Sequence, residues 1–242
     1  MSYHWNWGVF SQRAARNQTY LDWLLSGALF TVGLGLGSWG IALVVGTVLG
    51  VLRTVPNRLC SGLAATYVQV FRNVPLLVQL FIWYFVMPDL LPLGDTFKHL
   101  TPFVQQFGAA VLCLGTFTAA RVSELVRSGI LALPPGQKDA GLALGLTLTE
   151  TYRFVLLPMS LRIVVPPLTS EFLNVFKNSA VASTIGLLEL TAQGRQLVDY
   201  TAQPYESFIA VTLMYLCINT AVMALMHWVE RRARIPGHIG SH

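Results

Sequence analysis

Five long apolar runs dominate this chain, and short polar stretches separate them. Each run is long enough to cross a hydrocarbon core of ~30 Å, which requires about 20 residues of α-helix. The pattern therefore predicts an all-α integral membrane protein with five transmembrane helices, at residues 24–52, 63–87, 104–131, 154–176 and 207–230. The chain then consists of an amino-terminal tail at 1–22, a transmembrane domain at 23–230 and a carboxy-terminal tail at 231–242.

A short polar segment interrupts the apolar pattern after the third run. Pro134-Pro135-Gly136 should end the preceding helix, because proline offers no amide donor. A new helix is predicted from Gln137 to Leu146, roughly 15 Å long at 1.5 Å per residue, with Asp139 in its first turn, where a negative charge suits the helix dipole. Gly145 permits a close approach or a bend. Small side chains leave one side of this helix shallow, at Ala140, Gly141 and Ala143.

Breaks and close contacts are also predicted within the spans. Proline should kink or break them at Pro75, Pro88 and Pro166-Pro167, which membranes tolerate where the freed backbone groups face protein or water. Glycines spaced four apart in the first span indicate close helix packing, at Gly33, Gly37, Gly46 and Gly50. The more polar stretch 177–206 is predicted as an outer loop or a re-entrant segment.

Composition supports a membrane protein and argues against other classes. Hydrophobic residues make up 54% of the 242 and charged residues 11%, against about 25% charged in soluble proteins. The amino-terminal sequence lacks the pattern of a cleaved signal peptide. The three cysteines have neither metal-ligand spacing nor an even framework, so we expect no metal site and no disulfide. The net charge of +5 is not arranged in a basic stripe, so no nucleic-acid partner is expected.

The positions of lysine and arginine predict the orientation in the membrane. With five spans the two tails face opposite sides, and the cytoplasmic side should carry more basic residues. A cytoplasmic carboxyl terminus gives that side nine: Arg53, Arg58, Arg127, Lys138, Arg153, Arg162, Arg231, Arg232 and Arg234. The outer side then has four: Arg13, Arg16, Lys98 and Arg195. The amino terminus is therefore predicted to be periplasmic, with its aromatic residues Trp5, Trp7 and Tyr20 at the membrane interface.

Charged residues inside predicted spans are candidates for substrate binding, because a charge near the bilayer centre costs about 2.5–3.5 kcal/mol on insertion scales. Arg121 and Glu124 share a face of the third span. Glu124 has two possible partners on its own helix, Arg121 and Arg127. Pairing with Arg127 would leave Arg121 free to hold a carboxylate through its planar guanidinium.

Other polar residues at the span ends extend this candidate site. Arg72, Lys177 and Asn178 are placed to supply further contacts for a dicarboxylic amino acid. The alternative is a structural role, in which Arg72 and Lys177 cap helix ends or extend to the membrane interface. For Glu171, Asn174 and Asn178, which share a helical side, a hydrogen-bonded packing seam is the expected role.

The polar segment resembles the coupling loop of ABC-importer permeases. That loop reads Glu-Ala-Ala, three residues, Gly, nine residues, then an aliphatic residue, any residue and Leu-Pro. The chain has Asp139-Ala140-Gly141, then Gly145, Val155 and Leu157-Pro158. The resemblance implies that Gln137, Asp139, Ala140, Gly141, Gly145, Leu157 and Pro158 contact an ATPase subunit.

Three further blocks are similar to polar amino-acid ABC permeases, above all to the permease subunits of bacterial glutamate/aspartate importers. They are Phe71–Gln79, Glu124–Ile130 and Pro166–Thr169 through Phe176–Ser179. The resemblance implies a type I importer fold in the bacterial inner membrane, with the coupling loop 134–158 in the cytoplasm. It also implies an acidic amino acid as cargo and three kinds of protein partner: a periplasmic solute-binding protein, a second homologous permease subunit and two ATPase subunits.

The chain carries no phosphate-binding loop, since it contains no Gly-Lys pair. We therefore expect no enzymatic activity and no cofactor in this chain, with ATP and magnesium bound by the partner ATPase. An ion-coupled secondary amino-acid transporter is the main alternative, but such proteins commonly contain paired repeats that are not evident here. A membrane enzyme is disfavoured because the five histidines do not converge in sequence, and a passive channel would need no coupling loop.

Overall fold

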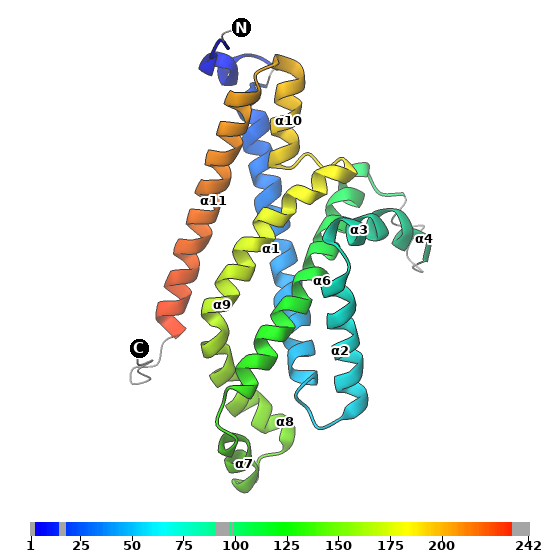
Figure 1. Ribbon diagram of the computed structural model, residues 1–242, viewed down its shortest axis with the longest axis vertical. Coiled ribbons are helices and arrows are strands. Elements are labelled where there is room, and N and C mark those ends of the chain that lie inside the picture. The colour runs from blue at the N-terminus through cyan, green and yellow to red at the C-terminus, as the bar shows by residue number, and fades with distance from the viewer. Residues whose placement is uncertain (1–2, 15–17, 91–96, 98, 234–242) are drawn as a thin grey trace.

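The computed structural model describes residues 3–14, 18–90, 97 and 99–233, and these residues form a helical bundle (Figure 1). Within these ranges the only strand-like pairing is an isolated bridge between Arg13 and Thr19. The predictions for Arg16, Lys98 and Arg234 lie outside the described residues. The helices are η1 Trp7–Ser11, α1 Tyr20–Leu52, α2 Arg58–Asn73, α3 Leu76–Phe81, η3 Ile82–Val86, α4 Met87–Leu90, α6 Pro102–Leu131, α7 Gly136–Ala143, α8 Leu148–Thr151, η4 Tyr152–Leu156, α9 Leu157–Asn178, η5 Ser179–Ile185, α10 Leu190–Thr201 and α11 Pro204–Ala233.

Four helical segments of the described chain are long and apolar enough to cross a membrane: Tyr20–Leu52, Pro102–Leu131, Leu148–Ile185 and Pro204–Arg232. A fifth crossing requires α2 to be combined with Leu76–Leu90, and the two are bent by 106° at their junction. The five predicted apolar runs therefore correspond to helices. However, residues 63–87 form a broken helix, as the proline at position 75 suggested.

The side chain of Gln79 stabilises this break. Pro75 precedes α3 and supplies no amide hydrogen, so carbonyl groups near the end of α2 lose helical partners. Gln79 Nε2 donates to the carbonyl oxygens of Phe71 at 2.9 Å and Val74 at 2.8 Å. A buried amide thus provides the hydrogen bonds that proline removes.

The other prolines act in two different ways. Both π-helical turns, η3 and η4, are followed after one residue by a proline, Pro88 and Pro158 respectively. A proline cannot make the bond to the carbonyl four residues earlier, and its ring crowds that carbonyl, which favours a wider turn. By contrast, Pro166-Pro167 do not break their span, because α9 continues through both residues, and of the predicted kink or break only the kink remains possible.

The centre of the bundle is the contact between α1 and α6, where two of the predicted glycines allow close packing. A Cβ atom on Gly46 would lie 2.6 Å from Val122 Cβ and 2.8 Å from the Ala119 carbonyl oxygen. A Cβ on Gly50 would lie 2.7 Å from Val126 Cβ. These distances are shorter than van der Waals contact, so any larger residue forces the two helices apart.

We therefore expect Gly46→Val to lower the free energy of unfolding by about 1–3 kcal/mol or more, as overpacking of a close helix contact does. Thermal unfolding of the purified protein in detergent provides the measurement. Gly40→Val is the matched control, because Gly40 lies on the same helix and a Cβ there meets nothing within 4 Å. Equal melting temperatures for the two variants would contradict the expectation.

Most of the stretch 177–206 is helical, so its prediction as an outer loop is wrong, and its alternative, a re-entrant segment, stays a prediction. After η5 the chain turns at Gly186, which has φ +86°, and continues into α10. The buried carboxylate of Glu189 caps α10 by accepting from the backbone amides of Thr191 and Ala192. The hydroxyl of Tyr215 on α11 donates to the same carboxylate at 2.9 Å, which fixes α10 against α11.

The described part of the amino-terminal segment, residues 3–14, also packs against the bundle. Val9 on η1 is buried in a cluster with residues of α1, α10 and α11. The fully buried carboxylate of Glu206 accepts hydrogen bonds from the Tyr3 hydroxyl and the Asn6 backbone amide. Trp5 and Trp7 stack on each other and remain exposed. This segment and α10 lie at one end of the molecule, and α7 lies at the opposite end (Figure 1).

Candidate functional site

The predicted coupling helix is present, but it ends earlier than expected. α7 spans Gly136–Ala143, and Leu144 is its C-cap. Gly145 follows with φ +86°, its amide donates to the Leu142 carbonyl at 3.0 Å, and the Leu146 amide donates to the Gly141 carbonyl at 3.2 Å. These two bonds form a Schellman motif, in which a glycine takes the left-handed conformation. Gly145 therefore serves as a helix terminator.

Contacts with the next turn hold α7 in place. A Cβ atom on Gly141 would lie 2.8 Å from Thr151 Cγ2, so only glycine allows α7 to pack on α8 at this distance. Thr147 and Glu150 start α8 with a reciprocal capping box. Leu144 is 83% exposed at the end of α7. An apolar side chain this exposed at a helix end, on a rigid support, is available to a partner protein.

The coupling segment is joined directly to the transmembrane helices. Leu157 and Pro158 are the first residues of α9, so the motif runs from α7 into a span. In the preceding turn the buried Tyr152 donates through its hydroxyl to the Thr54 carbonyl, at 2.8 Å, in the connection between α1 and α2. The turn η4, on which α7 packs, is therefore hydrogen-bonded to the α1–α2 connection.

A cluster of ionic groups lies between α1, α2 and α6. Glu124 Oε2 is 2.5 Å from Arg53 Nη1 and 3.8 Å from Arg72 Nη1, and Glu124 Oε1 is 3.6 Å from Arg127 Nη1. Of the two partners predicted for Glu124 on its own helix, the structure pairs it with Arg127. The nearest partner, Arg53, was not predicted. One carboxylate thus lies among three guanidinium groups, which leaves excess positive charge.

Arg121 forms an ion pair, whereas its predicted role in substrate binding assumed that its guanidinium would be free. Its Nη1 is 3.6 Å from Glu171 Oε1 on α9, and its guanidinium lies over the ring of Phe117 at 5.2 Å. The Arg121 side chain remains 44% exposed and that of Glu171 is 18% exposed. A distance of 3.6 Å is a loose ion pair, so donor capacity of Arg121 is left for another carboxylate.

Lys177 and Asn178 are not brought to this cluster. They are at the carboxyl end of α9, where Lys177 is exposed. Lys177 is six residues beyond Glu171, about 9 Å further along the helix axis at 1.5 Å per residue. The proposed substrate contacts therefore divide into one group around Arg121 and Glu124, to which Arg72 belongs, and a separate pair near the end that carries α10.

Sequence reasoning missed two of these residues: Arg53 in the cluster around Glu124, and Glu171 as the partner of Arg121. Arg53 follows the last apolar residue of its span and has the pattern of an ordinary basic residue at a membrane boundary. Glu171 has helical spacing to Asn174, which suggested a packing seam. Both are recognised only once α1 and α9 are placed against α6. In the described part of the chain, no group of three or more His, Cys, Asp or Glu side chains is arranged to hold a metal ion.

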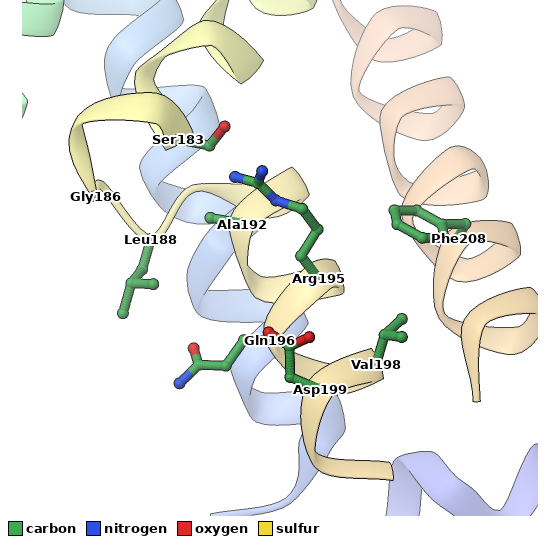
Figure 2. Close-up of a pocket in the computed structure, with 9 residues that line it drawn as sticks. All are labelled: Ser183, Gly186, Leu188, Ala192, Arg195, Gln196, Val198, Asp199 and Phe208. Atoms are coloured by element: carbon green, nitrogen blue, oxygen red, sulfur yellow. The ribbon is translucent and has the colours of Figure 1, made fainter. Parts of the chain in front are cut away.

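A pocket of about 400 Å³ lies at the opposite end of the molecule from α7, between η5, α10 and α11 (Figure 2). Its polar residues include Ser183, Arg195, Gln196 and Asp199. Leu188 and Phe208 are exposed apolar residues that line it. Arg195 was predicted only as an outer-side cation, so this pocket is an unpredicted feature of the fold.

Comparison with known proteins identifies the family. Residues 20–235 match the family described as binding-protein-dependent transport system inner membrane components. The chain belongs to this family. This binding-protein-dependent permease is 54% identical to the glutamate/aspartate import permease protein GltJ of Escherichia coli (strain K12), over 99% of each chain. It is 31% identical to the glutamine transport system permease protein GlnP of the same strain, over 88% of this chain and 93% of GlnP.

Solved structures agree with this family and confirm the type I importer fold. An amino acid ABC transporter crystallised with histidines has a chain that is 29% identical, with a TM-score of 0.73 over 88% of this permease and 95% of that chain. The inward-facing MetNI methionine ABC transporter matches with a TM-score of 0.75 over 89% and 98%, at 22% identity, and shows the fold alone. The permease is therefore a multi-pass, inner-membrane transport subunit and not an enzyme.

Proposed function

We propose that this permease is the membrane-spanning subunit of an ATP-driven importer that carries acidic amino acids, glutamate and aspartate, from a periplasmic binding protein to the cytoplasm. The observation that carries the proposal is the identity of 54%, over almost the whole of both chains, to a glutamate/aspartate import permease. At 31% identity, the glutamine permease is a more distant relative.

The charges of the site support an acidic cargo. Three arginines, at positions 53, 72 and 127, lie around Glu124, and Arg121 forms a separate pair with Glu171. The cluster therefore has an excess of two positive charges in a region where charge is costly without a counter-ion. A dicarboxylic amino acid, with a net charge of −1 at neutral pH, lowers this cost. We assign Arg121 to a cargo carboxylate, since its ion pair with Glu171 is loose, at 3.6 Å, and its side chain is 44% exposed.

We assign one kind of protein partner to each end of the molecule. Two ATPase subunits bind the α7 helices of this chain and of a second, homologous permease subunit, and they also hold the ATP and magnesium. The binding protein docks at the end that carries α10, which places the amino terminus in the periplasm and the carboxyl terminus in the cytoplasm. ATP binding brings the ATPase subunits together and moves α7, and the spans then change from inward-open to outward-open.

Reconstitution in proteoliposomes tests the proposal. The permeases, the ATPase subunits and the binding protein are combined, and uptake of radiolabelled L-glutamate is measured with and without ATP inside the vesicles. We expect uptake that requires ATP and that excess L-aspartate inhibits more than excess L-glutamine does. Uptake driven by a sodium or proton gradient without ATP would instead establish the alternative, an ion-coupled secondary transporter.

A further inference from the structure

The pocket between η5, α10 and α11, which we call the α10 pocket, contains two opposite charges that pair with no described residue. Arg195 and Asp199 are four residues apart on α10, a spacing at which such side chains commonly pair. No ion pair within 4.0 Å joins them, and none joins either of them to another described residue. In Figure 2 the Arg195 guanidinium extends away from the Asp199 carboxylate. The pocket therefore offers one positive and one negative contact point that are separated in space.

The pocket lies where a membrane-spanning helix begins. Phe208 lines the pocket and is the fifth residue of the segment Pro204–Arg232, so it is about 6 Å from the start of that segment at 1.5 Å per residue. α10 lies directly beside this part of α11, because the Ser207 hydroxyl donates to the Gly194 carbonyl at 2.6 Å and a Cβ on Gly194 would lie 2.5 Å from Val211 Cγ2. The polar headgroups of phospholipids occupy the boundary of the hydrocarbon core. The charges of α10 are therefore at the depth of these headgroups.

Exposed apolar side chains extend from the pocket along α11. Leu188 and Phe208 line the pocket and are exposed. Ile209, Leu213 and Leu216 are also exposed, and their spacing of four and three residues places them on one face of the helix. This face provides apolar contact for an acyl chain that runs parallel to α11 toward the centre of the bilayer.

A phospholipid headgroup that contains both a phosphate and a primary ammonium matches the two charges of the pocket. The planar guanidinium of Arg195 can bind phosphate oxygens through two parallel hydrogen bonds, and a primary ammonium can donate to the carboxylate of Asp199. In phosphatidylethanolamine an ethylene linker separates the phosphate from the ammonium, so the two groups can contact separate partners. Basic pockets beside membrane helices are typical binding sites for lipid headgroups.

The shape of the pocket suits a lipid better than a free amino acid. An amino acid also carries both charges, but small-molecule sites bury ~70–90% of the surface of their ligand. Arg195 and Asp199 are both exposed, and the pocket of about 400 Å³ opens to the surroundings. A headgroup needs less enclosure, because its acyl chains in the bilayer hold it near the pocket at a high effective concentration.

The pocket is also far from the residue assigned to the cargo. Gly186, which lines the pocket, lies against Gln106 of α6, since a Cβ on this glycine would be 3.0 Å from Gln106 Nε2. Gln106 is fifteen residues before Arg121 on the same helix, about 22 Å along its axis. A single amino acid cannot contact both places, so the pocket has a separate role.

We propose that the α10 pocket binds the headgroup of a zwitterionic amine phospholipid, with its phosphate on Arg195, its ammonium on Asp199 and an acyl chain along Phe208 and the apolar face of α11. The bound lipid joins α10 to α11 at the end of the molecule opposite α7. The proposal goes beyond the proposed function and does not depend on the identity of the cargo, since neither charged residue belongs to the group around Glu124 or to the pair of Arg121 with Glu171.

Native mass spectrometry of the complete transporter tests the proposal. The transporter is purified in detergent and titrated with phosphatidylethanolamine or phosphatidylglycerol, and the apparent dissociation constants of the bound lipids are measured. The two lipids share the phosphate, but phosphatidylglycerol has a glycerol in place of the ammonium.

The two charged residues should affect the two lipids differently. Arg195→Gln should weaken the binding of both lipids about tenfold or more, because each loses its charge-assisted phosphate contact. Asp199→Asn should weaken the binding of phosphatidylethanolamine about fivefold or more. The same variant should bind phosphatidylglycerol equally well or more tightly, because the removed carboxylate repels an anionic lipid.

Arg13→Gln is the matched control. Arg13 is also an exposed arginine in the segment packed at this end of the molecule, but it does not line the pocket. Loss of its charge should change the binding of either lipid by less than about twofold, in keeping with the small effect of isolated surface charges. Size-exclusion chromatography should show intact complexes for all three variants, because all three side chains are exposed.

Three results would overturn the proposal. Unchanged lipid binding in Arg195→Gln would show that the phosphate is held elsewhere or that another subunit covers the pocket. Equal losses of the two lipids in Asp199→Asn would show that the carboxylate does not recognise an ammonium. Release of bound phosphatidylethanolamine from the wild type by free L-glutamate at millimolar concentration would make the pocket an amino-acid site.

Discussion

Replacing Arg121 with alanine should reduce uptake of L-glutamate about 100-fold or more while the transporter still assembles. The guanidinium can form two charge-assisted hydrogen bonds with a carboxylate, each worth about 1.5–3 kcal/mol, and 2.8 kcal/mol already corresponds to a factor of about 100. The variant is measured by uptake of radiolabelled L-glutamate in proteoliposomes. Arg121→Lys should recover only part of the activity, since lysine lacks the planar fork.

The pairing of Arg121 with Glu171 suggests a sharper control. If Arg121 served only to neutralise Glu171, removal of both charges in Arg121→Ala/Glu171→Ala would restore uptake, because no unpaired carboxylate would remain between α6 and α9. A cargo-binding arginine predicts that the double variant stays inactive. Normal uptake by either Arg121→Ala or the double variant would remove Arg121 from the substrate site.

Replacing Gly145 with valine should uncouple the permease from its ATPase subunits. At φ +86° a β-branched residue is strained by about 1–3 kcal/mol, which shifts the equilibrium away from the observed end of α7 by about 5- to 150-fold. The Schellman bonds at Leu142 and Gly141 would be lost with it. Co-purification of the ATPase with the tagged permease measures the docking, and ATP-dependent uptake measures the coupling.

Two further variants separate backbone strain from steric bulk. A Cβ atom on either Gly145 or Gly136 meets nothing within 4 Å, but only Gly145 has positive φ. Gly136→Val should therefore retain the ATPase. Gly145→Asn should retain much of it as well, because asparagine tolerates the left-handed conformation. Loss of the ATPase in all three variants would point to a requirement for a small surface at both ends of α7, and would contradict the backbone explanation.

Local signals in the sequence were sufficient for the long apolar helices and for the presence of the short helix α7. Apolar runs marked the spans because only helices of that length satisfy their own backbone in lipid. Pro75 indicated the break after α2, since a missing amide hydrogen has a local effect. Gly145 was expected to permit a close approach or a bend inside a helix that ran to Leu146, whereas in the structure its left-handed backbone follows the end of α7.

Long-range pairing could not be predicted in the same way. Arg53 and Glu124 are seventy-one positions apart, and nothing in the sequence near either residue indicates the other. The helix α10 was missed because its stability comes largely from Glu189 and from packing on α11, which periodicity within a polar stretch does not show. The continuous path of α9 through Pro166-Pro167 is a third case, in which tertiary packing overrides a local preference.

The hydrogen bond between Tyr152 and Thr54 has a mechanical consequence. The Tyr152 hydroxyl joins the start of the fourth apolar helical segment to the connection between α1 and α2, almost one hundred positions earlier in the chain. In the proposed importer, we therefore expect a push on α7 by an ATPase subunit to reach α9 through the chain itself and the α1–α2 connection through this bond. The two parts of the bundle would then move together without any relay between them.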